Sequence, residues 1–346
     1  MRAVAVLAAK DEGAFLLDWV AHARAAGFSD LVIVTNDCSD GTDAMADRLS
    51  AMGVAVHLRN PGPHPKGPQW HALALAGRHP SVRDADWCMV HDIDEFLCVK
   101  VGDGTVAALL GAVPGADAVA VTWRMFGNGG VAAYEDRPVV EQFRRAAPAV
   151  YAWPWRAQLV KTLFRVGLWD RLGVHRPRRP VAGREAVWVD GSGRRLSGAW
   201  AQSRIIAEPG QETTALVQLN HYALGAMESY IVKCARGRAN REAAGLDMGY
   251  WVERNLCAVE DGAADRLAAP RGAVRAELGA DPVLARLHAR AVAWRRARFA
   301  ALMREEPWRA LYGRLMMTPP SRVLSAAEAA AIRAHAGPGG GGRPRG

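Results

Sequence analysis

The sequence predicts an α/β fold, in which a mostly parallel sheet is covered by helices on both faces. Over residues 1–100, apolar strand-like runs alternate with helical patterns across short connections, which is typical of a sheet built from strand–helix units. The chain has 346 residues, half of them apolar, and is long enough to bury a large core. Its apolar runs fall well short of the ~20 residues that a membrane-spanning helix needs.

The first strand–helix units can be placed in order. Residues 3–9 are a continuous apolar run suited to a buried strand, and residues 15–26 carry apolar side chains at helical spacing. Further strands are expected at 31–35, 54–58 and 87–90, with helices at 42–52 and 69–78. This alternation with short connections indicates a Rossmann-like half.

The pattern of the later part is less regular. A helix is expected at 105–113, and strands are expected at 118–124, 157–164, 186–189 and 216–219. From residue 227 onward the pattern is helical, with amphipathic helices at 283–303 and 325–336. Residues 337–346 contain only Gly, Pro and Arg, which predicts a disordered tail.

The charge of the chain is unevenly distributed. The net charge is +9, yet residues 1–140 hold 11 basic and 17 acidic side chains, so the basic excess lies in the later part. A nucleic-acid binder would need a basic face with a recognition motif, and the sequence shows no such motif. Five cysteines without C-x-x-C spacing indicate neither a disulfide framework nor a zinc site. Without a signal-peptide pattern, a cytoplasmic protein is expected.

The sharpest motif, His91-Asp92-Ile93-Asp94-Glu95-Phe96, directly follows the strand expected at 87–90. Residues i and i+2 at the end of a strand share a face, so Asp92 and Asp94 are expected to point to the same side. Adjacent carboxylates repel each other unless a cation lies near them, and oxygen ligands suit Mg²⁺ or Mn²⁺. Ligands bind at this edge of a parallel sheet, so a metal or nucleotide site is favoured over a solvated acidic turn.

Two more acidic loops follow strands at the same edge. Asn36-Asp37-Cys38-Ser39-Asp40-Gly41-Thr42 follows the second strand, and Lys10-Asp11-Glu12 follows the first. Their carboxylates can accept hydrogen bonds from a base or a ribose. Capping of the next helix by Asp40 or Thr42 is an equally good interpretation.

These three motifs, in this order, resemble those of family-2-type glycosyltransferases with the GT-A fold. The best match is a branch related to glycosyltransferase family 92, with the pattern K-N-E, N-x-x-S-D-G-T and D-x-D-E-F. The likeness extends to about residue 240, through Asn220-His221-Tyr222. It implies that a sugar is moved from a nucleotide diphosphate sugar, with a UDP-sugar favoured, to a saccharide or lipid-linked acceptor. Mn²⁺ or Mg²⁺ would bridge the D-x-D motif and the pyrophosphate.

The same resemblance implies a domain organisation. A GT-A domain is expected at 1–240, with a nucleotide-binding half at 1–100 and an acceptor half at 101–240. A helical extension at 241–336 would follow. The basic part of the chain is suited to a pyrophosphate, an acidic acceptor or an anionic membrane surface. A peripheral contact with the inner face of a membrane is therefore compatible with the cytoplasmic location.

The site residues follow from the resemblance position by position. The expected nucleotide-binding residues are Lys10, Glu12, Asp37, Asp40, Lys66 and Asp92. The expected metal ligands are Asp92, Asp94 and His221, and the expected diphosphate-binding residues are Lys161, Lys233, Arg236 and Arg238. For His221 a structural histidine is an equally good interpretation, and Arg236 and Arg238 are equally compatible with a solvated helix face.

An inverting transfer requires a base for the acceptor hydroxyl. The expected catalytic residues are Asp94, Glu95 and Asp190, and Glu135 and Asp136 are further candidates for the base. No acceptor-side Q-x-x-R-W motif is present, which disfavours a processive synthase.

Two other functions compete with sugar transfer. A phosphatase or phosphotransferase of the haloacid dehalogenase type also carries D-x-D after a strand, but at its first strand, whereas three strands precede the motif here. A basic, non-catalytic nucleic-acid binder is the second alternative, and the acidic first block argues against it.

Overall fold

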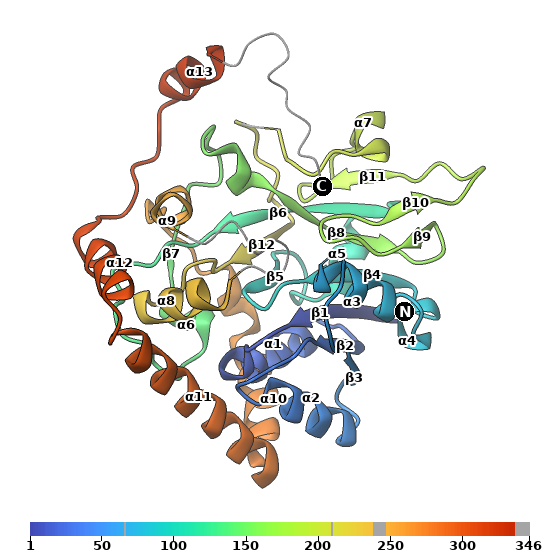
Figure 1. Cartoon of the computed structure of the whole chain (residues 1–346). Coiled ribbons are helices and arrows are strands. Elements are labelled where there is room, and N and C mark those ends of the chain that lie inside the picture. The colour runs from blue at the N-terminus through green and yellow to red at the C-terminus, as the bar shows by residue number, and fades with distance from the viewer. Residues whose placement is uncertain (66, 209, 238–246, 336–346) are drawn as a thin grey trace.

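The computed structural model describes residues 1–65, 67–208, 210–237 and 247–335. The expected α/β fold is confirmed: nine strands form one curled sheet in the order β3-β2-β1-β4-β8-β6-β12-β5, with β11 beside β6 (Figure 1). The strands are β1 Ala3–Ala9, β2 Asp30–Thr35, β3 Val56–Arg59, β4 Trp87–His91, β5 Glu95–Val99, β6 Ala118–Met125, β8 Val160–Arg165, β11 Trp188–Asp190 and β12 Val217–His221. Short pairs are formed by β7 Arg145–Ala146 with β13 Val259–Glu260, and by β9 Trp169–Arg171 with β10 Arg178–Pro180.

The sheet is mostly parallel. Strands β1 to β4 are parallel to one another, and β6 is parallel to β11 and β12. Strand β8 is antiparallel to both β4 and β6, and β5 is antiparallel to β12. The carboxyl ends of β1, β2 and β4 therefore meet at one edge, where the three acidic loops were expected.

Helices cover both faces of the sheet because the side chains of each strand alternate between two cores. One core joins Ala5 and Leu7 of β1 to α1 (Gly13–Ala25) and α2 (Thr42–Ala51). The other joins Val4 and Val6 to α3 (Pro68–Ala76). The remaining helical segments are α4 Pro80–Arg83, α5 Val106–Ala112, α6 Val139–Gln142, η1 Trp155–Gln158, α7 Gly198–Gln202, α8 Met227–Arg236, α9 Met248–Arg254, η2 Ala263–Leu267, α10 Ala268–Ala280, α11 Pro282–Leu302, α12 Glu306–Met317 and α13 Ala326–Ala334.

Strand β5 differs from the sequence expectation. Residues 95–99 follow the acidic motif directly, and their five side chains are all buried. A tight turn at 92–95, closed by the backbone N–H of Glu95 donating to the carbonyl of Asp92 at 3.1 Å, reverses the chain into this strand. The motif is therefore a tight corner between two strands that do not pair with each other.

The C-terminal helices α10 and α11 pack against α1, as Figure 1 shows where the orange helices lie beside the blue ones. Ion pairs join them to the first half of the chain: Arg48 of α2 holds Asp281, and Arg275 lies 3.5 Å from Asp18. The expected extension is thus an integral layer of the molecule. Within the described ranges, every helix is too short or too polar to span a lipid bilayer.

Gly13, the first residue of α1, sits where α11 comes closest. A Cβ atom at this position would lie 2.8 Å from the Cβ of Ala291 and 3.2 Å from Oδ2 of Asp40. We expect Gly13→Ala to lower the free energy of unfolding by about 1–3 kcal/mol, because overpacking must displace α11 or the Asp40 loop. Urea denaturation measures this. The matched control is Gly272→Ala in α10, where no atom lies within 4 Å of the added Cβ. That change should be neutral or stabilising, and equal stability of the two variants would contradict the expected clash.

Candidate active site

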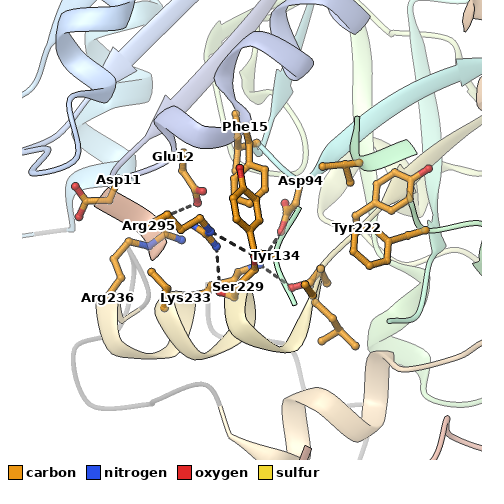
Figure 2. Close-up of a pocket in the computed structure, with 18 of the residues that line it drawn as sticks. Asp11, Glu12, Phe15, Asp94, Tyr134, Tyr222, Ser229, Lys233, Arg236 and Arg295 are labelled. Carbon is orange, nitrogen blue, oxygen red and sulfur yellow. Dashed lines mark hydrogen bonds and ion pairs between the residues drawn. The ribbon is translucent and has the colours of Figure 1, made fainter. Parts of the chain in front are cut away.

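A pocket opens at the carboxyl edge of the sheet, between the start of α1, the turn after β4, and helices α8 and α11 (Figure 2). Three acidic and three basic side chains line it together with aromatic rings. The acidic and basic residues are Asp11, Glu12, Asp94, Lys233, Arg236 and Arg295, and the aromatic residues are Phe15, Tyr134, Phe143, Tyr222 and Trp294.

The two aspartates of the D-x-D motif point to different partners. Oδ2 of Asp92 accepts a hydrogen bond from Lys161 Nζ at 2.9 Å, whereas Oδ2 of Asp94 accepts one from Lys233 Nζ at 2.7 Å. The expectation of a shared side is corrected, because β4 ends at His91 and the aspartates lie in the turn, where strand alternation no longer applies.

Asp94, which lines the pocket, faces His221. Oδ1 of Asp94 lies 3.6 Å from Nε2 of His221, the last residue of β12. Burial alone would raise the pKa of Asp94, but Lys233 and His221 outweigh it and hold that pKa well below its usual value. Burial lowers the pKa of His221, so its imidazole is neutral at pH 7. Among the described residues, Nδ1 of His221 has no hydrogen-bond partner.

This pair fits part of the expected metal site. An ionised carboxylate and a neutral imidazole are suitable donors for Mn²⁺ or Mg²⁺, and the facing atoms are close enough to share one ion. Asp92 does not join them, since its carboxylate is turned toward Lys161 and toward Gln69 Nε2 at 3.3 Å. Asp94 and His221 thus lie within reach of one ion, and Asp92 lies apart from them.

A second group of metal-type side chains, Asp11, Cys38 and Asp40, lies at the ends of β1 and β2. Asp40 accepts hydrogen bonds from the backbone N–H groups of Gly13 and Thr42, both at 2.8 Å. Burial raises the pKa of the Cys38 thiol to about 12, so the sulfur is protonated. The group is a hydrogen-bonded corner that holds the starts of α1 and α2, which matches the capping interpretation of Asp40.

Glu95 lies beneath the turn with no solvent-exposed surface. Its Oε1 accepts the Trp123 indole N–H at 2.7 Å, and its Oε2 lies 3.3 Å from Lys161 Nζ. Burial raises the pKa of Glu95, while the ammonium of Lys161 opposes that rise. In this structure the carboxyl group is closed off from solvent, which disfavours the expected role as a base.

Lys161 of β8 is also completely buried, and the carboxylates of Asp92 and Glu95 hold its ammonium. Burial alone would lower the pKa of Lys161, but these carboxylates raise it, so the lysine stays charged. The expected contact with a diphosphate is corrected: this lysine neutralises the acidic turn from below.

Arg236, near the end of α8, joins the loop after β1 to the pocket. Its guanidinium pairs with Glu12 and donates to the carbonyl of Lys10 at 2.5 Å. Asp37 is exposed at the neighbouring loop, where its carboxylate lies 3.3 Å from the backbone N of Gly62. Lys66 and Arg238 lie outside the described residues.

The other candidates for the base are held away from the pocket. The carboxylate of Asp190 accepts hydrogen bonds from the backbone N–H groups of Ser192 and Arg194 at 2.9 and 3.0 Å, so it stabilises its own turn. Asp136 lies 3.0 Å from Nε2 of His288 in α11 and ties the C-terminal helices to the loop before α6. Glu135 is exposed beside Arg137.

Sequence reasoning missed the residues that α11 brings to this pocket. Trp294 and Arg295 are separated from the D-x-D motif by some two hundred residues, yet both line the pocket beside Asp94 and Lys233. The residue spacing in α11 does contain a signal that Arg295 faces inward. Arg295 follows Ala291 by four positions and is followed by Leu302 seven positions later, so it lies on the apolar stripe.

The chain is similar in structure to several solved proteins. No protein-family model matches the chain, and no curated protein matches it. Glucosyl-3-phosphoglycerate synthase from Mycobacterium tuberculosis, in complex with Mn²⁺, UDP and glucosyl-3-phosphoglycerate, is 19% identical over 36% of this chain and 44% of that chain, with a TM-score of 0.24. Residues 1–349 of TarS from S. aureus are 11% identical over 49% of this chain and 48% of that chain, with a TM-score of 0.31.

A third similar structure is a putative glucose-1-phosphate thymidylyltransferase from Bacillus anthracis in complex with a sucrose. It is 12% identical over 39% of this chain and 61% of that chain, with a TM-score of 0.26. The chain spans about half or less of the length of the first two structures. At these identities and TM-scores the function has to be argued from the site itself.

Proposed function

We propose that this protein is a metal-dependent glycosyltransferase that moves a sugar from a nucleoside diphosphate sugar, with a UDP-sugar as the favoured donor, to a saccharide or lipid-linked acceptor. One observation carries the proposal. Asp94 lies at the carboxyl edge of a parallel sheet, with a neutral imidazole on one side and the ammonium of Lys233 on the other. Carboxylate, imidazole and protein cations together suit a metal–diphosphate group.

The surrounding residues support distinct roles in donor binding. Asp94 and His221 would hold Mn²⁺ or Mg²⁺, which when bound would neutralise the diphosphate. Lys233 and Arg236 would stabilise the leaving diphosphate, whose negative charge grows as the sugar–phosphate bond breaks. Glu12 and Asp37, in the loops after β1 and β2, would contact the nucleoside.

The motif resemblance also supports a proposal about the type of transfer. The resemblance favours an inverting transfer, and the missing Q-x-x-R-W motif favours a non-processive one. A site in the cytoplasm, with peripheral contact to the inner face of a membrane, would suit a lipid-linked acceptor. The structure assigns no carboxylate as the acceptor base.

A donor screen tests the proposal with the native protein. Thermal unfolding is recorded with UDP-, GDP- and dTDP-sugars, with Mn²⁺ or with EDTA, and release of the nucleoside diphosphate is followed in parallel. A UDP-sugar at 100 times its dissociation constant should add about 2.7 kcal/mol to the stability of the protein. We expect stabilisation and slow UDP release with Mn²⁺ and neither effect with EDTA. Hydrolysis of a phosphomonoester, without binding of any nucleotide sugar, would instead support the phosphatase alternative.

A further inference from the structure

Helix α11 inserts a buried arginine into the wall of the pocket. Arg295 has only 6% of its surface exposed, and it lines the pocket together with Lys233 and Arg236 of α8. Figure 2 shows its guanidinium between Glu12 and α8. Three cationic side chains from two helices that are distant in sequence therefore lie around one opening.

The three cations differ in how their charge is balanced. Lys233 pairs with Asp94, and Arg236 pairs with Glu12. Arg295 instead donates to Ser229, through Nε to Oγ at 3.3 Å and through a terminal nitrogen to the backbone carbonyl at 3.1 Å. In the part of the chain that the structure describes, no carboxylate forms an ion pair with it.

Aromatic rings provide the rest of its environment. The guanidinium carbon lies 4.4 Å from the ring centroid of Phe15 and 5.7 Å from that of Tyr134. Burial lowers the pKa of Arg295, and Glu12, the carboxylate that most opposes this effect, already pairs with Arg236. Ring faces and a serine compensate a buried cation only in part, and an unpaired buried charge costs several kcal/mol. An anion entering the pocket would supply the missing charge.

We propose that Arg295 is a binding residue for a phosphate group of the substrate, and that the C-terminal helices therefore form part of the substrate site. This inference rests on the proposed function, because it places the phosphate next to Lys233 and Arg236. The phosphate could belong to the donor diphosphate or to a phosphorylated acceptor. The chemistry of recognition is the same in both cases.

Calorimetric titrations of the full chain with UDP, uridine, inorganic pyrophosphate and inorganic phosphate test this role. We expect Arg295→Gln to weaken binding of at least one phosphate-bearing probe tenfold or more, the equivalent of about 1.4 kcal/mol, and to leave uridine unaffected. Weaker binding of UDP and pyrophosphate would indicate the donor diphosphate. Weaker binding of inorganic phosphate alone, with native affinity for UDP, would indicate a phosphorylated acceptor. Arg298→Gln, an exposed arginine on the same helix, is the matched control and should bind all four probes as the native protein does.

A second measurement avoids any dependence on the folding of the variant. Phenylglyoxal labelling of Arg295 in the native protein, located by peptide mass spectrometry, should slow in the presence of UDP or pyrophosphate and not in the presence of uridine. Unchanged anion affinity in folded Arg295→Gln, or labelling that no anion slows, would overturn the inference. Neither readout requires sugar transfer. Failure of the glycosyltransferase proposal would appear separately in the donor screen.

Discussion

Asp94→Asn is expected to reduce metal-dependent UDP release at least a hundredfold. The substitution keeps the size of the side chain and removes its charge, so it weakens the carboxylate–imidazole pair and leaves Lys233 without its counter-ion. A hundredfold loss corresponds to about 2.7 kcal/mol of transition-state stabilisation, which is within the range that a metal clamp supplies. Initial rates with saturating Mn²⁺ measure the effect, using the sugar nucleotide found in the donor screen.

The control for this variant is Asp170→Asn. Asp170 is an exposed aspartate of β9, on the short two-stranded sheet with β10. The Asp170→Asn variant should retain the native rate of UDP release. Both variants should melt within a few degrees of the native protein. An Asp94→Asn enzyme that keeps its rate within threefold of native would contradict the assigned role.

Lys161→Met should cause the largest loss of stability. The lysine is completely buried, and its ammonium neutralises Glu95, which is also completely buried, and Asp92. Removing one partner of a buried ion pair leaves an uncompensated charge, which typically costs about 3–5 kcal/mol. Urea denaturation at pH 7 measures the change in unfolding free energy.

The pH dependence of this loss identifies the group responsible. Burial raises the pKa of Glu95 in the folded protein, so the folded state binds a proton at pH values where the unfolded chain is ionised. Stability linked to such a group falls as pH rises above the unfolded pKa of about 4.3. Because the Lys161 ammonium opposes this rise, Lys161→Met should raise the pKa of Glu95 further, and the deficit should grow as the pH rises above about 8, where native Glu95 ionises. The double variant Lys161→Met/Glu95→Gln should recover part of the loss, and equal deficits at pH 7 and pH 9 would exclude Glu95 as the cause.

Strong local patterns account for the parts of the fold that the sequence predicts. Continuous apolar runs such as residues 3–9 lie in the centre of the sheet with helices on both faces, and each is bounded by polar loop residues. Because parallel strands end at a common edge, the positions of the acidic loops follow from the strand order. Lys233 and Arg236 line the same pocket as Asp94, and His221 lies 3.6 Å from the Asp94 carboxylate.

The remaining features depend on contacts that local patterns do not contain. The direction of Asp92 is set by Lys161, which is 69 residues later in the chain. The sequence places Glu95 in a polar turn, which predicts an accessible side chain. The side chain is buried because the turn leads the chain directly into β5. Arg295 lies on the apolar stripe of α11, but the stripe alone does not show which surface it covers.

The strand order also has a consequence for dividing the chain. Strand β8 of the second half pairs with β4 of the first half, and β5 of the first half pairs with β12 at the far edge of the sheet, so the two expected halves share one continuous sheet. A fragment ending at residue 100 would expose the edge of β4 and would leave Asp92 and Glu95 without Lys161. The first hundred residues are thus not a detachable module. Exchanging residues 101–240 between related proteins would require the segment around residues 160–165 to remain with the first hundred residues.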